Sequence, residues 1–264
     1  MPAGDAFWGG STTRFLWHKS GAGSATEWMT TVQRTGDTVA GLPPLTSDAF
    51  CADVRNTINQ YWRHTRGGTP TYSRSWFHVA QVYDDGTPEL RLYIDGIAVG
   101  TKYGPSGTRV GDLAGSLSIG GEPTTPGVWW NGSIGPVAFF DHALSGSRIA
   151  AHAATGTASA HATAVNGDSP EAFWRFDEAS GSLADDTGNG HTGTPAGGTI
   201  TYRAEGPWTG SYALAMPGDA RVTVPDHAAW SSTSFTVTGW CRPAPDPSSI
   251  WPGRSLVGAG HGLT

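Results

Sequence analysis

The residues best suited to chemistry lie together on one Gly-rich stretch, "DDTGNGH", at residues 185–191. It brings Asp185, Asp186, Asn189 and His191 close together in the sequence. Calcium takes about six to eight oxygen ligands, and carboxylates and flexible backbone carbonyls suit it. A calcium site is therefore one interpretation of this loop. The other is a solvated surface loop closed by Asx turns.

Other site chemistries are not indicated by the sequence. The nine histidines are scattered and neither cysteine has a partner at ligand spacing, which argues against zinc. There is no Glu-x-Asp-x-x-Glu stretch of the kind that places paired carboxylates on one strand for glycoside hydrolysis. The acidic residues of "YDDGTPE" are typical of a hairpin turn, and His78, inside a strand, is expected to be structural. Nucleophile-elbow, zinc-protease and phosphate-loop motifs are also missing from the sequence, so we do not expect an enzyme.

Two adjacent tryptophans, Trp129 and Trp130 in "PGVWWNGSIG", are the clearest candidates for ligand stacking. Neighbouring residues of a strand face opposite sides, so we expect Trp130 in the core and Trp129 at a rim. An exposed aromatic face there can stack on a sugar ring. Further candidates for ligand binding are Tyr103, Trp62 and Trp8. The alternative is that all of these aromatics pack in the core or at the sandwich edge.

The elements that would position these residues are short β-strands. The chain has 264 residues with 38 Gly, 18 Pro and 12 Trp, and only 14% charged residues, a composition typical of all-β proteins. Residues 75–86 and 89–100 each carry an Asp-Gly pair beside β-forming runs, which predicts hairpins. Residues 145–155 predict one short helix capped by Ser145. The small, polar residues 156–169 are typical of a linker.

Charge and hydropathy exclude some partners. The net charge of −6 and the two lysines leave no basic stripe for nucleic acid. No apolar run is long enough for membrane insertion, and the first residues lack the basic and apolar regions of a signal peptide. Cys51 and Cys241 could pair only if the fold brings their α-carbons within about 7 Å, and two buried free thiols are the favoured interpretation.

Several stretches resemble laminin G-like domains of the concanavalin A-like superfamily, in the bacterial and phage branch. "SWFHVAQVYDDGTPELRLYIDGIAVG" resembles the family's central hairpin. "LSIGG" and "WNGSIGPVAFFDHALSGSRI" resemble its C-terminal signature, and "FWRFDEASGSLADDTGNGHTG" its N-terminal one. The resemblance implies an antiparallel β-sandwich jelly roll.

The order of these stretches is reversed relative to the family. Residues 1–155 resemble the C-terminal two-thirds of the domain, and residues 170–264 its N-terminal third. One interpretation is a circularly permuted jelly roll in which the two segments complete one sandwich. The other is a slice of a tandem array, in which each segment pairs with a neighbouring copy or exchanges strands in an oligomer.

The resemblance also implies a role and a metal. Related domains often hold one structural Ca²⁺ between the Gly-rich loop and the C-terminal strand, which makes Asp186 the first ligand candidate and Asp177 the second. Gly135 stands where relatives often have an acidic residue, which weakens this expectation. The implied function is a non-catalytic recognition module that binds a glycan or a surface protein, secreted or at a virion surface such as a phage tail. A structural role in a virion or adhesin is the alternative.

Overall fold

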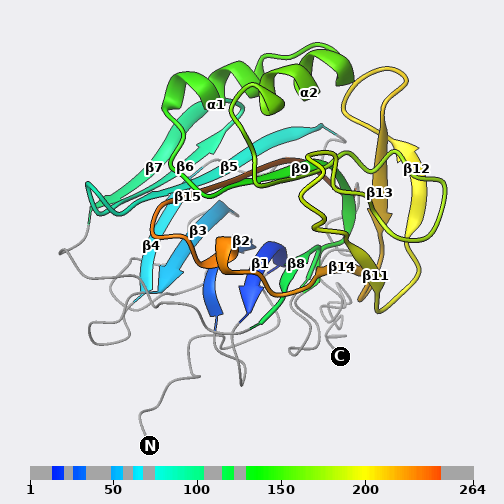
Figure 1. Cartoon of the computed structure of the whole chain (residues 1–264), viewed down its shortest axis with the longest axis horizontal. Coiled ribbons are helices and arrows are strands. Elements are labelled where there is room, and N and C mark those ends of the chain that lie inside the picture. The colour runs from blue at the N-terminus through cyan, green and yellow to red at the C-terminus, as the bar shows by residue number, and fades with distance from the viewer. Residues whose placement is uncertain are drawn as a thin grey trace, which may run out of the picture.

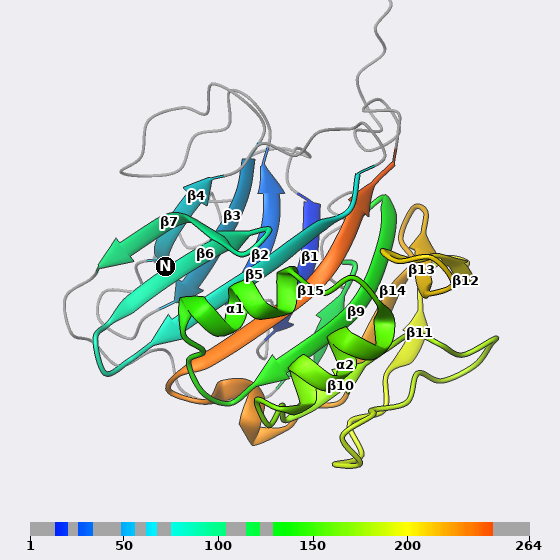
Figure 2. The same cartoon turned by 90° about the horizontal axis from the view of Figure 1, so that it is seen from above.

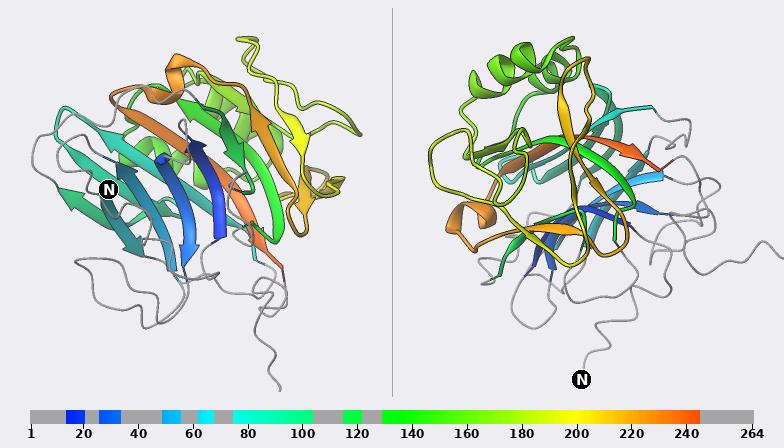
Figure 3. Two further views of the ribbon diagram at one scale, coloured as in Figure 1. Left: turned by 90° about the horizontal axis from the view of Figure 1, so that it is seen from below. Right: turned by 90° about the vertical axis from the view of Figure 1, so that its right-hand side faces the viewer.

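Two antiparallel β-sheets pack face to face, and two helices lie on the outer face of one of them (Figure 1). This computed structural model describes residues 14–20, 26–33, 49–55, 62–67, 75–103, 115–121 and 129–244. The arrangement confirms the expected β-sandwich of the jelly-roll class. The side view in Figure 3 shows the two layers edge-on.

The first sheet has seven strands, in the order β11 (Thr194–Ala196), β14 (Arg221–Val224), β8 (Leu117–Ile119), β1 (Arg14–Ser20), β2 (Thr26–Gln33), β3 (Ala49–Arg55) and β4 (Trp62–Gly67). The second has eight. Its main path runs β12 (Thr201–Glu205), β13 (Tyr212–Met216), β9 (Gly132–Phe140), β15 (Phe235–Pro243), β5 (Phe77–Asp84), β6 (Glu89–Ile94) and β7 (Ile97–Tyr103), and β10 (Ala172–Trp174) also pairs with β9.

Strands β5, β6 and β7 form the two predicted hairpins. Asp95 and Gly96, between β6 and β7, have φ angles of 51° and 80°. The left-handed region at both central positions is the geometry that suits a two-residue hairpin turn, and it favours Gly at the second position. The Asp95 carboxylate also accepts a hydrogen bond from the backbone N–H of His78, at 2.8 Å, which ties this turn to β5.

The core lies between the sheets, and period-two alternation explains its composition. On β5, Phe77, Val79 and Tyr83 belong to the cluster between the two sheets. Ala80 and Val82, on the other face of the same strand, belong to a second cluster beneath the helices. Both faces of the second sheet are therefore buried at β5, which is why this strand is a nearly continuous apolar run.

Strands from both sides of residues 156–169 occur in both sheets. Strand β15 lies between β9 and β5, pairing Phe235–Cys241 with residues of β5. In the first sheet β14 pairs with β8, which itself pairs with β1. Figure 2 shows β15 running between β9 and β5. Each sheet therefore contains strands from both segments.

Helix α1 (Gly146–Ala153) confirms the predicted helix, with the Ser145 hydroxyl accepting from the backbone N–H of Arg148. Residues 156–169, expected to be an irregular linker, instead contain a second helix, α2 (Ala158–Asn166), capped by Thr157. Its alanines favour the helix, and Val165 anchors it in the cluster beneath the helices. Neither helix is long and apolar enough to cross a membrane.

Candidate functional site

The Gly-rich loop is organised by the carboxylate of Asp185. Its Oδ1 accepts hydrogen bonds from the backbone N–H of Phe173 at 3.0 Å and from the N–H and hydroxyl of Thr187 at 3.1 and 2.8 Å. Its Oδ2 accepts from the N–H of His191 at 3.1 Å. This is the Asx-turn interpretation of the loop, with an added link to β10. Both oxygens of Asp185 are thus already committed to the protein itself.

The other expected calcium ligands are also engaged elsewhere. Asp177 and Asp186 both pair with Arg175, at 2.9 and 3.8 Å. The amide of Asn189 donates to the backbone carbonyl of Glu171 at 2.9 Å. A Ca²⁺ site at these residues therefore stays a prediction.

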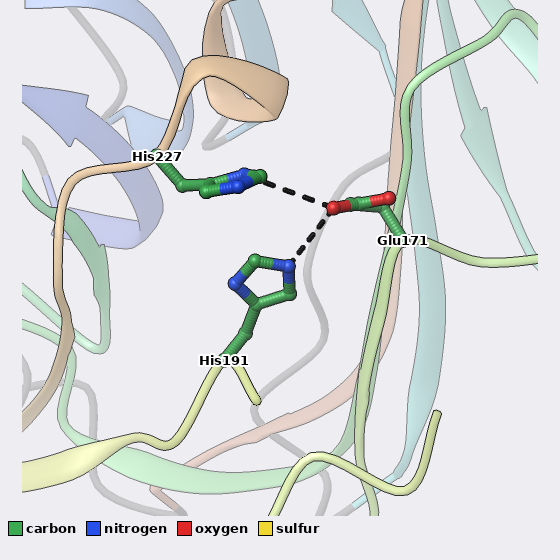
Figure 4. A group of neighbouring side chains, drawn as sticks. All are labelled: Glu171, His191 and His227. Carbon is green, nitrogen blue, oxygen red and sulfur yellow. Dashed lines mark hydrogen bonds and ion pairs between the residues drawn. The ribbon is translucent and has the colours of Figure 1, made fainter. Parts of the chain in front are cut away.

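The structure instead gathers a different set of potential ligands, shown in Figure 4. Glu171, His191 and His227 each offer one ligand atom, and these atoms all lie within 4.8 Å of one another. The His191 Nε2 is 2.9 Å from the Glu171 Oε1, and the His227 Nδ1 is 3.7 Å from the same oxygen. Among the residues that the structure describes, this is the one group of three such ligands.

Sequence reasoning missed this cluster because its members come from three separated segments. Glu171 precedes β10, His191 ends the Gly-rich loop, and His227 lies between β14 and the short 3₁₀ helix η3 (Ala228–Ser231). No local spacing motif links them. The only signal in the sequence was His191 within the loop itself.

The two adjacent tryptophans differ in burial in the expected direction. Trp130 is 1% exposed, whereas Trp129 is half-buried. Trp129 packs over Gly121, where an added Cβ would meet the ring at 2.7 Å. Trp8 and the side chains of Trp62 and Tyr103 lie outside the described residues. A role of these four aromatics in ligand binding therefore stays a prediction.

An open cleft of about 400 Å³ lies at one end of the second sheet. Its lining includes Asn131, which follows Trp129 by two residues in the chain. It combines amide, hydroxyl, carboxylate and guanidinium side chains, supplied by Asn131, Ser133, Thr201, Glu205 and Arg242. Glu205 and Arg242 form an ion pair at 3.0 Å. The Arg242 guanidinium also lies over the ring of Trp76, 4.9 Å from its centroid.

The remaining ionisable cluster is buried beneath the helices. His78, on β5, donates to or accepts from the Thr238 hydroxyl at 2.8 Å, and it is fully buried. The rings of His152 and His161 lie 6.5 and 6.3 Å from it, centroid to centroid. This enclosed setting supports the expected structural role of His78.

The comparisons with known proteins give a family. A family model described as the concanavalin A-like lectin/glucanases superfamily matches residues 3–150, more than half of the chain. The chain belongs to this superfamily. The laminin G-like resemblance of the sequence is thereby confirmed at the family level. Residues 171–227, which hold the Glu171 cluster, lie outside the matched region. Neither curated proteins nor solved structures gave a match to this chain.

Membership in this superfamily supports a carbohydrate-binding, ligand-binding or structural module. Cys51 and Cys241 are both buried in this structure. Burial raises the pKa of the Cys241 thiol well above its ordinary value, which keeps it protonated and unreactive.

Proposed function

We propose that this chain is a non-catalytic recognition module that binds a glycan or another cell-surface ligand at the cleft beside β9, β12 and β15. The observation that carries the proposal is the side-chain chemistry of the cleft. A sugar presents hydroxyls that donate and accept at once, and the cleft offers both kinds of partner from Asn131, Glu205 and Arg242. Trp129, which precedes Asn131 by two residues in the chain, and Trp76, which contacts Arg242, are the aromatic candidates for stacking on a ring.

The same cleft favours binding over hydrolysis. Glycoside hydrolysis generally uses two carboxylates flanking the bond. The residues lining the cleft include one carboxylate, Glu205, and it is paired with Arg242. This composition supports a module that holds its ligand unchanged.

A structural or assembly role is the second candidate. An assembly surface needs a contiguous apolar patch. Over the described ranges, the exposed large hydrophobic residues are Ile97, at 69% exposure, and Tyr212, at 36%. They lie on β7 and β13, five strands apart in the second sheet. Two separated side chains do not make such a patch, which favours ligand binding.

We also propose that the family's strands occur here in permuted order and are completed within one chain. The pairing of β15 with β5 and β9 supports this arrangement. Pairing with a tandem neighbour or by strand exchange remains the alternative. A role outside the cell or at a virion surface, as in an adhesin or phage tail, is part of the same proposal.

A glycan array with the whole chain tests the function. We expect binding to a limited set of glycans, weakened by Glu205→Gln, which removes the carboxylate charge beside Arg242 and keeps the shape of the side chain. The matched control is Glu89→Gln, because Glu89 also pairs with an arginine, at 3.8 Å, but lies on β6 at the other side of the sheet. An array on which no glycan is bound would favour the structural role. An equal loss of glycan binding in Glu205→Gln and Glu89→Gln would indicate that the binding site is not in the cleft.

A further inference from the structure

We propose that Glu171, His191 and His227 bind a first-row transition-metal cation, with Zn²⁺ the best fit. The cluster lies outside the cleft and outside the part of the chain matched by the family model. Two imidazoles and one carboxylate form the donor set. Imidazole nitrogen suits zinc, copper and nickel, whereas calcium takes oxygen ligands almost exclusively. The donor types therefore select against the metal that the loop sequence first indicates.

The spacing of the ligand atoms fits a tetrahedral ion. Metal–ligand distances of about 2.0–2.2 Å place two ligands of a tetrahedral zinc roughly 3.3 Å apart. The two measured separations from the Glu171 Oε1 are 2.9 Å to His191 and 3.7 Å to His227, on either side of that value. The two imidazole nitrogens lie within 4.8 Å of each other, so a rotation of the exposed His227 side chain would complete the set of three.

The ligands are held in place by the backbone around them. The N–H of Glu171 donates to the Phe139 carbonyl on β9 at 2.9 Å, and its own carbonyl accepts from Asn189. His191 is fixed by the hydrogen bond from its N–H to Asp185. Positioning of ligands by surrounding hydrogen bonds is typical of metal sites. The carboxylate of Asp185 thus supports the cluster by shaping the loop.

One buried aromatic supports both imidazoles. The ring of Trp230, which is fully buried, lies 4.6 Å from the His191 ring and 5.8 Å from the His227 ring, centroid to centroid. The Nδ1 of His227 accepts a 3.3 Å hydrogen bond from the N–H of Ala229. Metal binding through Nδ1 would exchange that long hydrogen bond for a metal–nitrogen bond.

The cluster is also accessible from one side. The side chains of His191 and Glu171 are 9% and 22% exposed, whereas that of His227 is 49% exposed. An ion can enter beside His227, and the fourth coordination position is left to water. Three protein ligands and one water form an open zinc site, in contrast to structural zinc sites, which have four protein ligands.

Isothermal titration calorimetry with Zn²⁺ and with Ca²⁺, on the whole chain stripped with a chelator, tests the proposal. We expect Zn²⁺ to bind at one site per chain that Ca²⁺ does not occupy. Glu171→Gln and His227→Asn should each weaken Zn²⁺ binding at least tenfold. Asparagine at position 227 can still cap η3, so this variant should fold normally.

The matched control is His142→Asn, which removes a half-exposed histidine paired with Asp141 away from the cluster. Zn²⁺ should raise the melting temperature of the wild type and of this control by a few degrees, and leave that of His227→Asn unchanged. The proposal is overturned by a wild type without saturable Zn²⁺ binding, by equal affinity in all four proteins, or by Ca²⁺ binding that survives His227→Asn.

Discussion

The Nε2 atom of His78 on β5 lies 2.8 Å from the hydroxyl of Thr238 on β15, a contact between residues 160 positions apart in the chain. It joins the segment before α2 to the segment after it. The same imidazole faces His152 on α1 and His161 on α2. This buried histidine cluster therefore connects the central strands to the helices that cover them.

The cluster predicts that the protein loses stability in mild acid. Burial lowers the pKa of His78 well below its ordinary value of 6.5, and His161 and His152 lower it further. Burial likewise lowers the pKa of His161 to about 4. That of His152 is also lowered by burial, although Asp168, which pairs with both His152 and Arg148, opposes the shift.

Between pH 6.5 and about 4 the unfolded chain binds more protons than the folded one. The free energy of unfolding therefore decreases as the pH is lowered through this window. His161 alone should cost about 2 kcal/mol at pH 5 relative to pH 7.5. Urea unfolding at both pH values measures the loss. His161→Gln should reduce the pH dependence, and His142→Gln should not. A pH dependence identical in wild type and His161→Gln would contradict this assignment.

The tryptophan pair predicts an asymmetry in stability. Trp130→Ala removes a fully buried ring and should cost about 3–5 kcal/mol through the cavity it leaves. Trp129→Ala should cost less than half of that, because Trp129 is half-buried. With a ligand identified, Trp129→Ala should weaken binding by about 1 kcal/mol or more. Chemical denaturation of the two variants measures the first effect. A larger loss at Trp129 than at Trp130 would mean that their roles are reversed.

The Gly-rich loop predicts that Asp185 matters more than Asp186. Asp185→Ala leaves several donors without their acceptor and should cost about 2–3 kcal/mol. Asp186→Ala removes one long pair to a half-exposed Arg175 and should cost less than about 1 kcal/mol. Thermal melts of chelator-stripped protein with and without millimolar Ca²⁺ should coincide. A rise in melting temperature with Ca²⁺ that disappears in Asp186→Ala would restore the calcium interpretation.

Local features of the fold could be predicted from the sequence. The hairpins of β5, β6 and β7 follow from two Asp-Gly pairs between β-forming runs, and α1 follows from its Ser145 cap. The burial of Trp130 was expected from strand periodicity and is observed, although Trp130 precedes β9 and lies outside any strand. Each of these depends on residues within a few positions of one another, where sequence patterns are most informative.

Features that depend on tertiary contact were not predictable in the same way. Helix α2 was missed because its small residues give only a weak apolar face, although Thr157 and the following alanines are a helix signal. The Glu171 cluster needs β10, the Gly-rich loop and the start of η3 to be placed together. The sequence also gave no spacing that links Arg242 on β15 to Glu205 on β12 in the cleft.

We propose that the two segments, residues 1–155 and 170–264, form a single core. Removing β15 from between β9 and β5 would expose both neighbouring edges and the apolar face that they share. Equilibrium unfolding of residues 1–155 expressed alone, beside the whole chain, tests this directly. We predict one cooperative transition for the whole chain and no cooperative transition for residues 1–155. Cooperative unfolding of residues 1–155 at the midpoint of the whole chain would contradict it.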